Sequence, residues 1–121
     1  MSREMDLGRR GEDMALEMLQ NRGLTLLERN WRWHHKELDL IMEGFGTVHF
    51  IEVKALRAPA DRNPWEAVTP EKQKNLAIAA EHYIYEHRIV KEAQFDIVSI
   101  LYDESGEAAV EYIERAFFPI Y

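Results

Sequence analysis

The chain has 121 residues, of which 46% are hydrophobic and 31% charged, with no cysteine and a net charge of -7 at pH 7. Enough apolar residues are present to build a core, so the composition excludes global disorder. The lack of cysteine excludes disulfide scaffolds, thiol catalysis and Cys-ligated zinc. The acidic balance argues against a passive nucleic-acid coat, because phosphate binding relies on Lys and Arg.

No apolar run approaches the roughly 20 residues of a membrane span. The opening segment MSREMDLGRRGEDMA lacks the apolar core of a secretory signal. With neither a repeat nor a linker, we expect one cytoplasmic domain over residues 1–121. The charges are unevenly distributed along it: residues 37–53 carry four acidic groups and no basic one, between two segments of net positive charge. This pattern suits a site that binds a metal ion and then a phosphate.

Residues 6–22 place apolar side chains at helical spacing before Gly23, which predicts a first helix. The segments 24–33, 36–42 and 47–54 then predict three strands. Gly44 and Gly46 separate the last two of them, so a hairpin is the natural connection.

Prolines and polar residues make residues 56–68 a loop, after which Thr69 begins a second helix that runs to about His87. Residues 95–102 form a short apolar strand that we expect to be buried on both faces. The segment AAVEYIERAF is an optional last edge strand. The order α-β-β-β-α-β predicts a mixed α/β domain whose sheet is covered on both sides.

The hairpin brings acidic residues together. A turn centred between Phe45 and Gly46 makes the numbers of opposed residues sum to 91, so Asp39 faces Glu52. The same register sets Glu37 against Lys54, and strand alternation assigns Leu38, Leu40 and Met42 to the other face.

Two directly opposed carboxylates repel each other unless a cation lies between them. Hard divalent cations such as Mg²⁺ take carboxylate oxygens and keep positions for water and phosphate. Lys54, two residues beyond Glu52, would assist the attacking water or stabilise charge on the phosphate. Glu12 lies on the apolar stripe of the first helix, where a charge needs a partner. That partner is either the same metal site or an arginine at the helix edge, and the hairpin residues could equally form a solvated, salt-bridged face.

The ordered motifs resemble the YraN-like family (uncharacterised protein family 0102) of the PD-(D/E)xK superfamily, whose restriction-endonuclease-like fold has an αβββαβ core. The resemblance spans roughly residues 8–98. Its elements are Gly11-Glu12 in the first helix, Asn30-Trp31-Arg32, Glu37-Leu38-Asp39, Glu52-Val53-Lys54, Thr69-Pro70-Glu71-Lys72-Gln73 and Phe95-Asp96-Ile97.

This resemblance implies that Asp39 and Glu52 bind a Mg²⁺ or Mn²⁺ ion and that Lys54 is the catalytic lysine. It also implies the Val53 carbonyl and Glu12, as in archaeal Holliday-junction resolvases, as further metal ligands. Gln73 or Lys72 matches the position from which the second helix reaches the site, and Gln73 joins the expected catalytic set. This sequence departs from the family pattern at three positions: Lys36 stands in place of a glycine, and Leu56 and Gln94 stand in place of basic residues. These losses touch probable phosphate contacts, so they weaken the expected DNA affinity more than the metal chemistry.

Other residues qualify as nucleic-acid contacts. Trp31 and Trp33 flank Arg32, and tryptophans so placed either pack in the core or stack on bases. The remaining basic candidates for phosphate contact, which could also be ordinary solvated side chains, are Arg57, Arg62, Lys72 and Lys74. His34 and His35 are poor joint metal ligands, because adjacent strand residues point to opposite faces.

We therefore expect a metal-dependent nuclease that hydrolyses DNA phosphodiesters, with structure-specific cleavage as one form of the activity. The alternative is a catalytically silent nuclease fold that binds nucleic acid or acts as a scaffold, which the acidic balance favours. DNA is the expected partner, a homodimer is one expected state, and neither a membrane nor an organic cofactor is expected. The apolar tail, residues 116–121, would either form an interface or fold back on the core.

Overall fold

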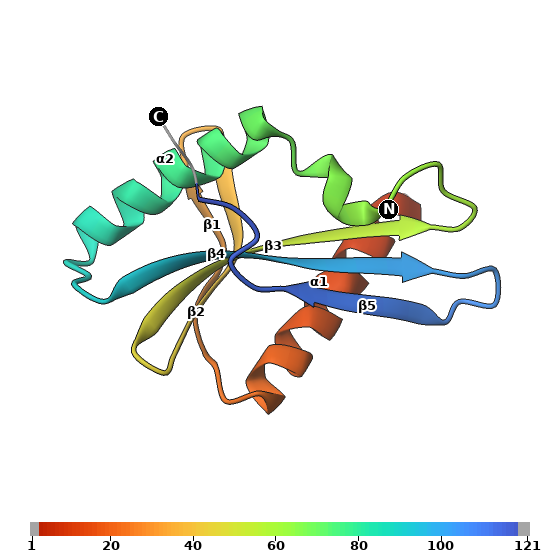
Figure 1. Ribbon diagram of the computed structural model, residues 1–121, viewed down its shortest axis with the longest axis horizontal. Coiled ribbons are helices and arrows are strands. Elements are labelled where there is room, and N and C mark those ends of the chain that lie inside the picture. Colours follow the sequence, from red (N-terminus) through yellow and green to blue (C-terminus); the bar gives the residue numbers. More distant parts are fainter. Residues whose placement is uncertain (1–2, 119–121) are drawn as a thin grey trace.

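The computed structural model describes residues 3–118 (Figure 1). Two helices, one 3-10 turn and five strands follow each other in the order that the sequence predicts, with the optional last strand present. The elements are α1 (Arg3–Asn21), β1 (Thr25–Trp33), β2 (Lys36–Gly44), β3 (Thr47–Arg57), η1 (Pro64–Ala67), α2 (Pro70–Glu86), β4 (Glu92–Tyr102) and β5 (Ala108–Ile113).

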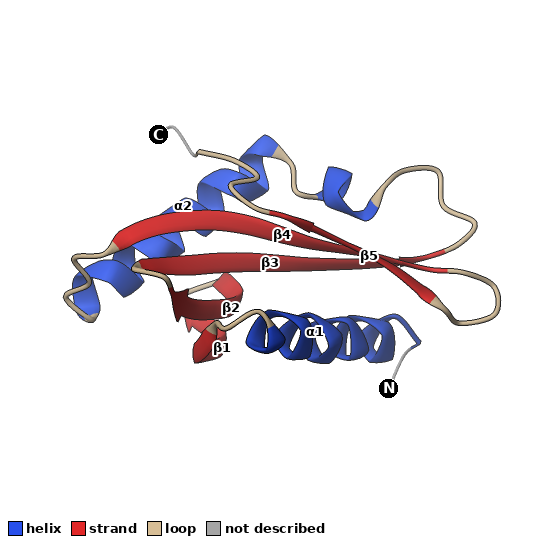
Figure 2. Ribbon diagram, turned by 60° about the horizontal axis from the view of Figure 1, so that its bottom comes forward, coloured by secondary structure: helices blue, strands red, loops and turns tan. Residues whose placement is uncertain are grey.

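The five strands form one mixed sheet in the order β1-β2-β3-β4-β5. The β3 and β4 strands are parallel, since η1 and α2 form the crossover between them, and every other neighbouring pair is antiparallel. Figure 2 shows α1 on one face of the sheet and α2 with η1 on the other. The predicted mixed α/β fold, with its αβββαβ core and helices on both sides, is confirmed.

Two hydrophobic cores follow from this layering. On the α2 face, Ile41, Val48 and Phe50 pack with Leu76 and Tyr83 of the helix. On the α1 face, apolar residues of the central strands pack against Ala15 and Leu19, and this second set includes Leu40, Met42, Ile51, Val98 and Ile100. The β4 strand supplies residues to both cores, so its predicted burial on both faces is confirmed.

The β2–β3 hairpin has the predicted register. Ile41 pairs with Phe50 and Gly44 with Thr47, so that the residue numbers of each pair sum to 91. Phe45 and Gly46 form the two-residue turn, and both have positive φ, at 55° and 79°. Two positive φ values are what a type I′ turn requires, and its twist matches that of the flanking strands.

One part of the predicted strand pattern is wrong: Leu38 does not share a face with Leu40. Leu38 packs in the core beneath α2, whereas Leu40 packs in the core beneath α1. The neighbouring strand reverses at the same level, because Arg29 reaches α1 while Trp31 packs edge-on against Tyr83 of α2.

The cause of this reversal is a local change of backbone conformation. Asn30 lies between the pairs Arg29–Leu40 and Trp31–Leu38, and it has a φ of 53° instead of an extended value. Left-handed backbone interrupts the alternation of side chains, and asparagine tolerates it better than most residues. Asp39 lies directly across from Asn30, at the level where both strands change face.

The remaining differences lie at element ends. The β3 strand continues to Arg57, and the predicted loop contains the short helix η1. Thr69 caps α2 by accepting a hydrogen bond from the Lys72 N–H at 3.2 Å, as expected. Of the apolar tail, Phe117 is buried against Phe95 with ring centroids 5.2 Å apart, and residues 119–121 lie outside the described residues. Neither helix of the described chain has the length and apolarity that a membrane crossing requires.

Candidate active site

The candidate site lies where β2 and β3 separate. Their ladder of paired residues ends at Leu40 and Ile51, one position before Asp39 and Glu52. There the Val53 N–H donates to Oδ2 of Asp39 at 2.9 Å, so a carboxylate takes the place of the next backbone partner. Figure 2 shows β1 and β2 running in a different direction from β3 and β4. The separation opens space for a side chain between the strands.

The carboxylates of Asp39 and Glu52, here called the acidic pair, are largely shielded from solvent. Glu52 is only 3% exposed. Burial, and then the hydrogen bond and negative charge of Glu52, raise the pKa of Asp39 to about 8, although the Val53 N–H and Lys54 act in the opposite direction. Asp39 therefore holds a proton near neutral pH.

Two lysines face the acidic pair from different elements. The Lys72 Nζ atom, from the first turn of α2, lies 3.2 Å from Oε2 of Glu52, and the Lys54 Nζ atom lies 3.8 Å from the same oxygen. Neither contact has hydrogen-bond geometry, and Oε2 is a buried atom that finds no hydrogen-bond partner among residues 3–118. A buried carboxylate oxygen that is only approached by cations marks a place for a further ligand.

Gln73 does not join these groups. Its side-chain amide donates to the Val68 carbonyl at 3.1 Å, and Gln73 lines a different pocket, beside Trp65 and Ile97. Successive helical residues point about 100° apart, so only one of Lys72 and Gln73 can face the sheet at this level. Of the two candidates on α2, Lys72 is the one that reaches Glu52.

Glu12 enters from α1 and is ion-paired. Its Oε1 atom lies 3.3 Å from the Nε atom of Arg29, while the Nη2 atom of Arg29 lies 2.7 Å from Asp13. The Glu12 pKa is raised, first by burial and then by the negative charge of Asp39, with Arg29 acting against both. The arginine partner expected for Glu12 is confirmed, and its role as a metal ligand stays a prediction.

The close approach of α1 to the sheet depends on Gly11. A Cβ atom at this position would lie 3.3 Å from the Cβ of Ala55 and 3.4 Å from Cδ1 of Ile100. These contacts are tighter than ordinary van der Waals packing, so a larger residue would push the helix outward. Gly11 therefore sets how far the adjacent Glu12 extends toward β2.

A polar pocket of about 370 Å³ opens beside Asp39 and Lys72. Its rim carries basic and hydrogen-bonding side chains from the β1–β2 hairpin and from α2: Arg32, His35, Lys36 and Asn75. Arg32 pairs with Glu37 across the strands at 2.8 Å, so Glu37 does not face Lys54 as expected. The pocket has the size and charge to admit a phosphate group next to the acidic pair.

The aromatic residues near this pocket have different roles. Trp31 is packed against Tyr83 in the core, with ring centroids 5.1 Å apart. Trp33 is stacked on His82 of α2 at 3.6 Å, and Lys36 lies over the Trp33 ring. His34 forms the hairpin turn instead of a strand position, and its φ is 56°.

The other basic candidates are more distant from the acidic pair. Arg57 ends β3, five residues beyond Glu52, and Arg62 lies in the exposed loop that follows. Lys74 is exposed on α2. The assignment of these three residues to nucleic-acid binding stays a prediction.

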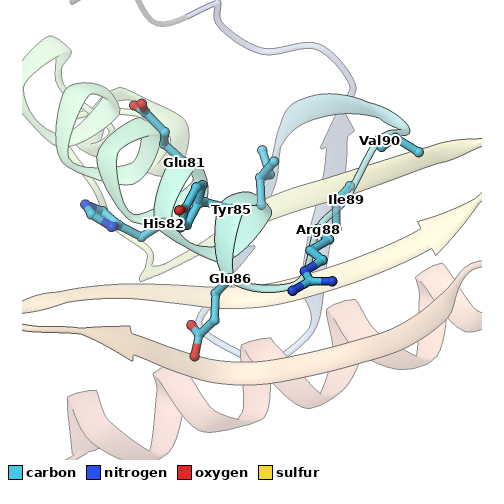
Figure 3. A pocket seen from close by; sticks show the side chains of 8 residues that line it. Glu81, His82, Tyr85, Glu86, Arg88, Ile89 and Val90 are labelled. Carbon is cyan, nitrogen blue, oxygen red and sulfur yellow. The ribbon is translucent and has the colours of Figure 1, made fainter.

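A more voluminous hollow, of about 950 Å³, lies elsewhere, at the end of α2. Figure 3 shows that its two carboxylates, Glu81 and Glu86, point away from each other. Paired carboxylates are therefore absent from this pocket. Its lining gives no chemistry comparable to that around Asp39 and Glu52.

The set of protein ligands at the acidic pair is small. Within residues 3–118, no group of three or more His, Asp or Glu side chains is close enough to hold a metal ion by itself. Asp39, Glu52 and the Val53 backbone would thus supply part of a coordination shell, as is common for Mg²⁺, which keeps several waters or substrate oxygens.

A second buried carboxylate was missed by sequence reasoning. Asp96, on β4 of the α1 face, accepts hydrogen bonds from Tyr112 and the Arg115 N–H and contacts the Nδ1 atom of His49 at 2.8 Å. Gln94 donates to it as well. Burial raises the pKa of Asp96, but these hydrogen bonds, led by that of His49, outweigh burial and lower it. The sequence signals were a charged residue inside an apolar strand and its place in the Phe95-Asp96-Ile97 motif, to which no role had been assigned.

Comparison with known proteins identifies relatives over the whole length. The profile described as Uncharacterised protein family UPF0102 matches residues 11–100. A UPF0102 protein of Syntrophomonas wolfei is 42% identical over 118 residues, which cover 97% of this chain and 100% of that protein. A UPF0102 protein of Clavibacter michiganensis is 39% identical over 117 residues, covering 96% and 99%. A third, from Christiangramia forsetii, is 34% identical over 118 residues, covering 98% of each.

Proposed function

We propose that this chain, which belongs to the uncharacterised protein family UPF0102, is a divalent-metal-dependent nuclease that hydrolyses DNA phosphodiester bonds. The observation that carries the proposal is the acidic pair, in which Oε2 of buried Glu52 has two lysines within 4 Å and no hydrogen-bond partner among residues 3–118. Buried groups of like charge are costly for stability, and a cation between them removes that cost.

The residues present fit a Mg²⁺ or Mn²⁺ ion. Asp39 and Glu52 offer hard oxygen ligands, the Val53 carbonyl is the adjacent backbone oxygen, and Glu12 is a further carboxylate that is influenced by the charge of Asp39. When bound, such an ion would polarise the scissile phosphate and lower the pKa of a water molecule. The low exposure of Glu52 keeps competing solvent from its carboxylate.

The other residues would position and neutralise the phosphate. Lys54, on the same strand face as Glu52, would orient the attacking water or balance the charge that develops on the phosphate oxygens. The pocket beside Asp39 and Lys72 would hold the phosphate, with Arg32 at its rim. Arg32 would leave Glu37 to do so, because their exposed ion pair is weak.

DNA is the proposed substrate class, and structure-specific cleavage, as by the Holliday-junction resolvases that the motifs resemble, is part of the proposal. The basic residues around the pocket are few, and the chain carries a net charge of -7. Affinity for a long, uniform duplex would therefore be low and strongly salt-dependent. At a junction, nick or frayed end the DNA backbone deforms more easily, so a phosphate reaches the pocket at a smaller energetic cost than in a uniform duplex.

The test is cleavage of labelled duplex, nicked, single-stranded and four-way-junction DNA with Mg²⁺, Mn²⁺ or EDTA. Cleavage by the wild type should require a divalent ion, and Glu52→Gln and Lys54→Met should lower the rate at least about 100-fold. Lys91→Met is the matched control, since it breaks an ion pair with Glu43 away from the site. Retained cleavage in both site variants, with circular dichroism showing that they are folded, would refute the site.

A second candidate function is a nuclease fold that binds nucleic acid or a protein without turnover. It is favoured by a specific observation, namely that lysines approach Glu52 and that Arg29 pairs with Glu12 even without a metal. Under this alternative, DNA binding would be insensitive to EDTA and to Asp39→Asn. Fluorescence anisotropy with and without Mg²⁺ separates the two functions, because the nuclease requires the ion and the acidic pair for tight binding.

A further inference from the structure

Lys72 stands in an electrostatically unusual position. It occupies the first turn of α2, directly after the N-cap Thr69, where the helix dipole is positive and a cation is disfavoured. Its ammonium group nevertheless points inward and lies 3.2 Å from Oε2 of Glu52. The negative charge of the acidic pair is the feature that compensates for this placement.

The contact between Lys72 and Glu52 is a close ion pair at the edge of hydrogen-bond geometry. By strict geometry, Oε2 of Glu52 has no hydrogen-bond partner in the described chain, although two ammonium groups lie within 4 Å of it. An ammonium group in such a contact gives up less on leaving than one that donates a well-aligned hydrogen bond. The Lys72 side chain also keeps 42% of its surface exposed, against 30% for Lys54, so it has room to move.

The same lysine borders the pocket that opens beside Asp39. Lysine has a flexible four-carbon stem and a compact charge, so a rotation about its side-chain bonds moves the ammonium group from Glu52 into this pocket. Once there, it would lie near the α2 N-terminus, where anions are favoured. One side chain can therefore serve either the carboxylate or an anion in the pocket.

We propose that Lys72 is a built-in counter-ion that occupies the acidic pair in the metal-free protein and is displaced by the divalent ion toward the substrate phosphate. This inference rests on the proposed function. A divalent cation at Glu52 repels the nearby ammonium group and takes over the neutralisation of the carboxylates. Metal binding would thereby release a cation that binds the phosphate, so the ion and the DNA would each favour binding of the other.

Removal of Lys72 should therefore have opposite effects on the two ligands. In Lys72→Met, calorimetric titration with Mg²⁺ or Mn²⁺ alone should give binding at least about tenfold tighter than in the wild type, because the competing cation is gone. The affinity for a DNA duplex, measured by anisotropy with Ca²⁺ present, should fall at least about tenfold. Lys91→Met, which removes the partner of Glu43, should change neither affinity.

Thermal unfolding gives a readout that does not depend on DNA or turnover. Without metal, Lys72→Met should be less stable than the wild type, because Glu52 loses its nearest cation; saturating Mn²⁺ should raise its Tm by more than it raises that of the wild type. Lys72→Gln repeats the comparison with a polar side chain, in case the methionine variant does not fold.

The outcomes separate the two proposals. Tighter metal binding together with weaker DNA binding in the Lys72 variants supports the counter-ion role. Equal or weaker metal binding in these variants, with a wild type that binds metal, overturns that role and leaves the metal site standing. A wild type that binds no metal with or without DNA overturns the proposed function and this inference with it.

Discussion

Two buried carboxylate centres on one sheet show how differently the same chemical group can be accommodated. Asp96, on the α1 face, has hydrogen bonds from Gln94, Tyr112 and the Arg115 backbone in addition to His49, and its pKa is lowered. The acidic pair on the other side of the sheet has one backbone donor, two approaching lysines and a raised pKa at Asp39. Both centres are buried, and they differ in how many hydrogen bonds their carboxylate oxygens accept.

A buried carboxylate whose oxygen atoms all accept hydrogen bonds stabilises the fold. A buried pair whose oxygen atoms lack hydrogen bonds can still bind a ligand. The Asp96 centre joins β3, β4 and the segment after β5, since His49, Tyr112 and Arg115 come from those parts of the chain. The acidic pair lies where the sheet opens; its backbone donor is the Val53 N–H, and its cationic contacts are Lys54 and Lys72. Function is therefore proposed at the second centre only.

Asp96→Asn should have the largest effect on stability. Asparagine cannot accept all the hydrogen bonds of the carboxylate and places an amide donor against a donor, so the free energy of unfolding should fall by about 3 kcal/mol. Urea denaturation followed by tryptophan fluorescence measures it. A loss below about 1 kcal/mol would mean that the Asp96 centre is not structural.

The two centres should also give the protein opposite pH dependences. The pKa of Asp39 is raised from 3.8 to about 8, so the folded state holds a proton that the unfolded state releases, and its contribution to stability is lost as the pH rises between these values. The slope is at most about 1.4 kcal/mol per pH unit. Asp96, with a lowered pKa, contributes stability above the usual aspartate pKa that is lost as the pH falls through its folded value.

Urea denaturation in EDTA at a series of pH values resolves the two contributions. Asp39→Asn should remove the decline toward alkaline pH, and Asp96→Asn should remove the loss toward acid pH. An unchanged alkaline slope in Asp39→Asn would show that Asp39 titrates normally in the folded protein.

Gly11→Ala should have an intermediate effect on stability. The added methyl group would lie against Ala55 and Ile100, so α1 must shift and the free energy of unfolding should fall by about 1 kcal/mol. The change moves Glu12 and leaves the Asp96 centre intact. If the variant gained stability, as an alanine in an open helical position would, the close approach of α1 to β3 would be refuted.

Asp39→Asn should cost the least stability of these substitutions. At pH 8 it removes the repulsion from Glu52 and retains an acceptor for the Val53 N–H, so the free energy of unfolding should stay equal or rise. The contrast with Asp96→Asn is the measurement of interest. A loss as large as that of Asp96→Asn would make Asp39 a structural residue.

The sequence was sufficient for the layout of the sheet and for part of the site. Alternation, turn residues and the Thr69 cap predict the elements, and the register through Phe45-Gly46 brings Asp39 close to Glu52. These features are local, and each is determined by residues a few positions apart.

The remaining features depend on how distant elements meet. The positive φ of Asn30 accompanies the turn of Leu38 to the α2 face, and the residue pattern of the strand does not predict this φ value. The rotation of α2 about its axis decides that Lys72 and not Gln73 reaches Glu52. The parallel register of β3 and β4 brings His49 next to Asp96. This register depends on the long connection through η1 and α2, and not on a short turn.

The most direct test of the central claim is calorimetric titration of Mg²⁺ and Mn²⁺ into the metal-free protein. We predict binding in the wild type and in Glu104→Gln, a control carboxylate in an exposed turn, and no binding in Asp39→Asn/Glu52→Gln. The titration is repeated with a DNA duplex that carries uncleavable linkages, because the substrate supplies part of the coordination shell. Equal heats in the wild type and the double variant, with and without DNA, would contradict the account.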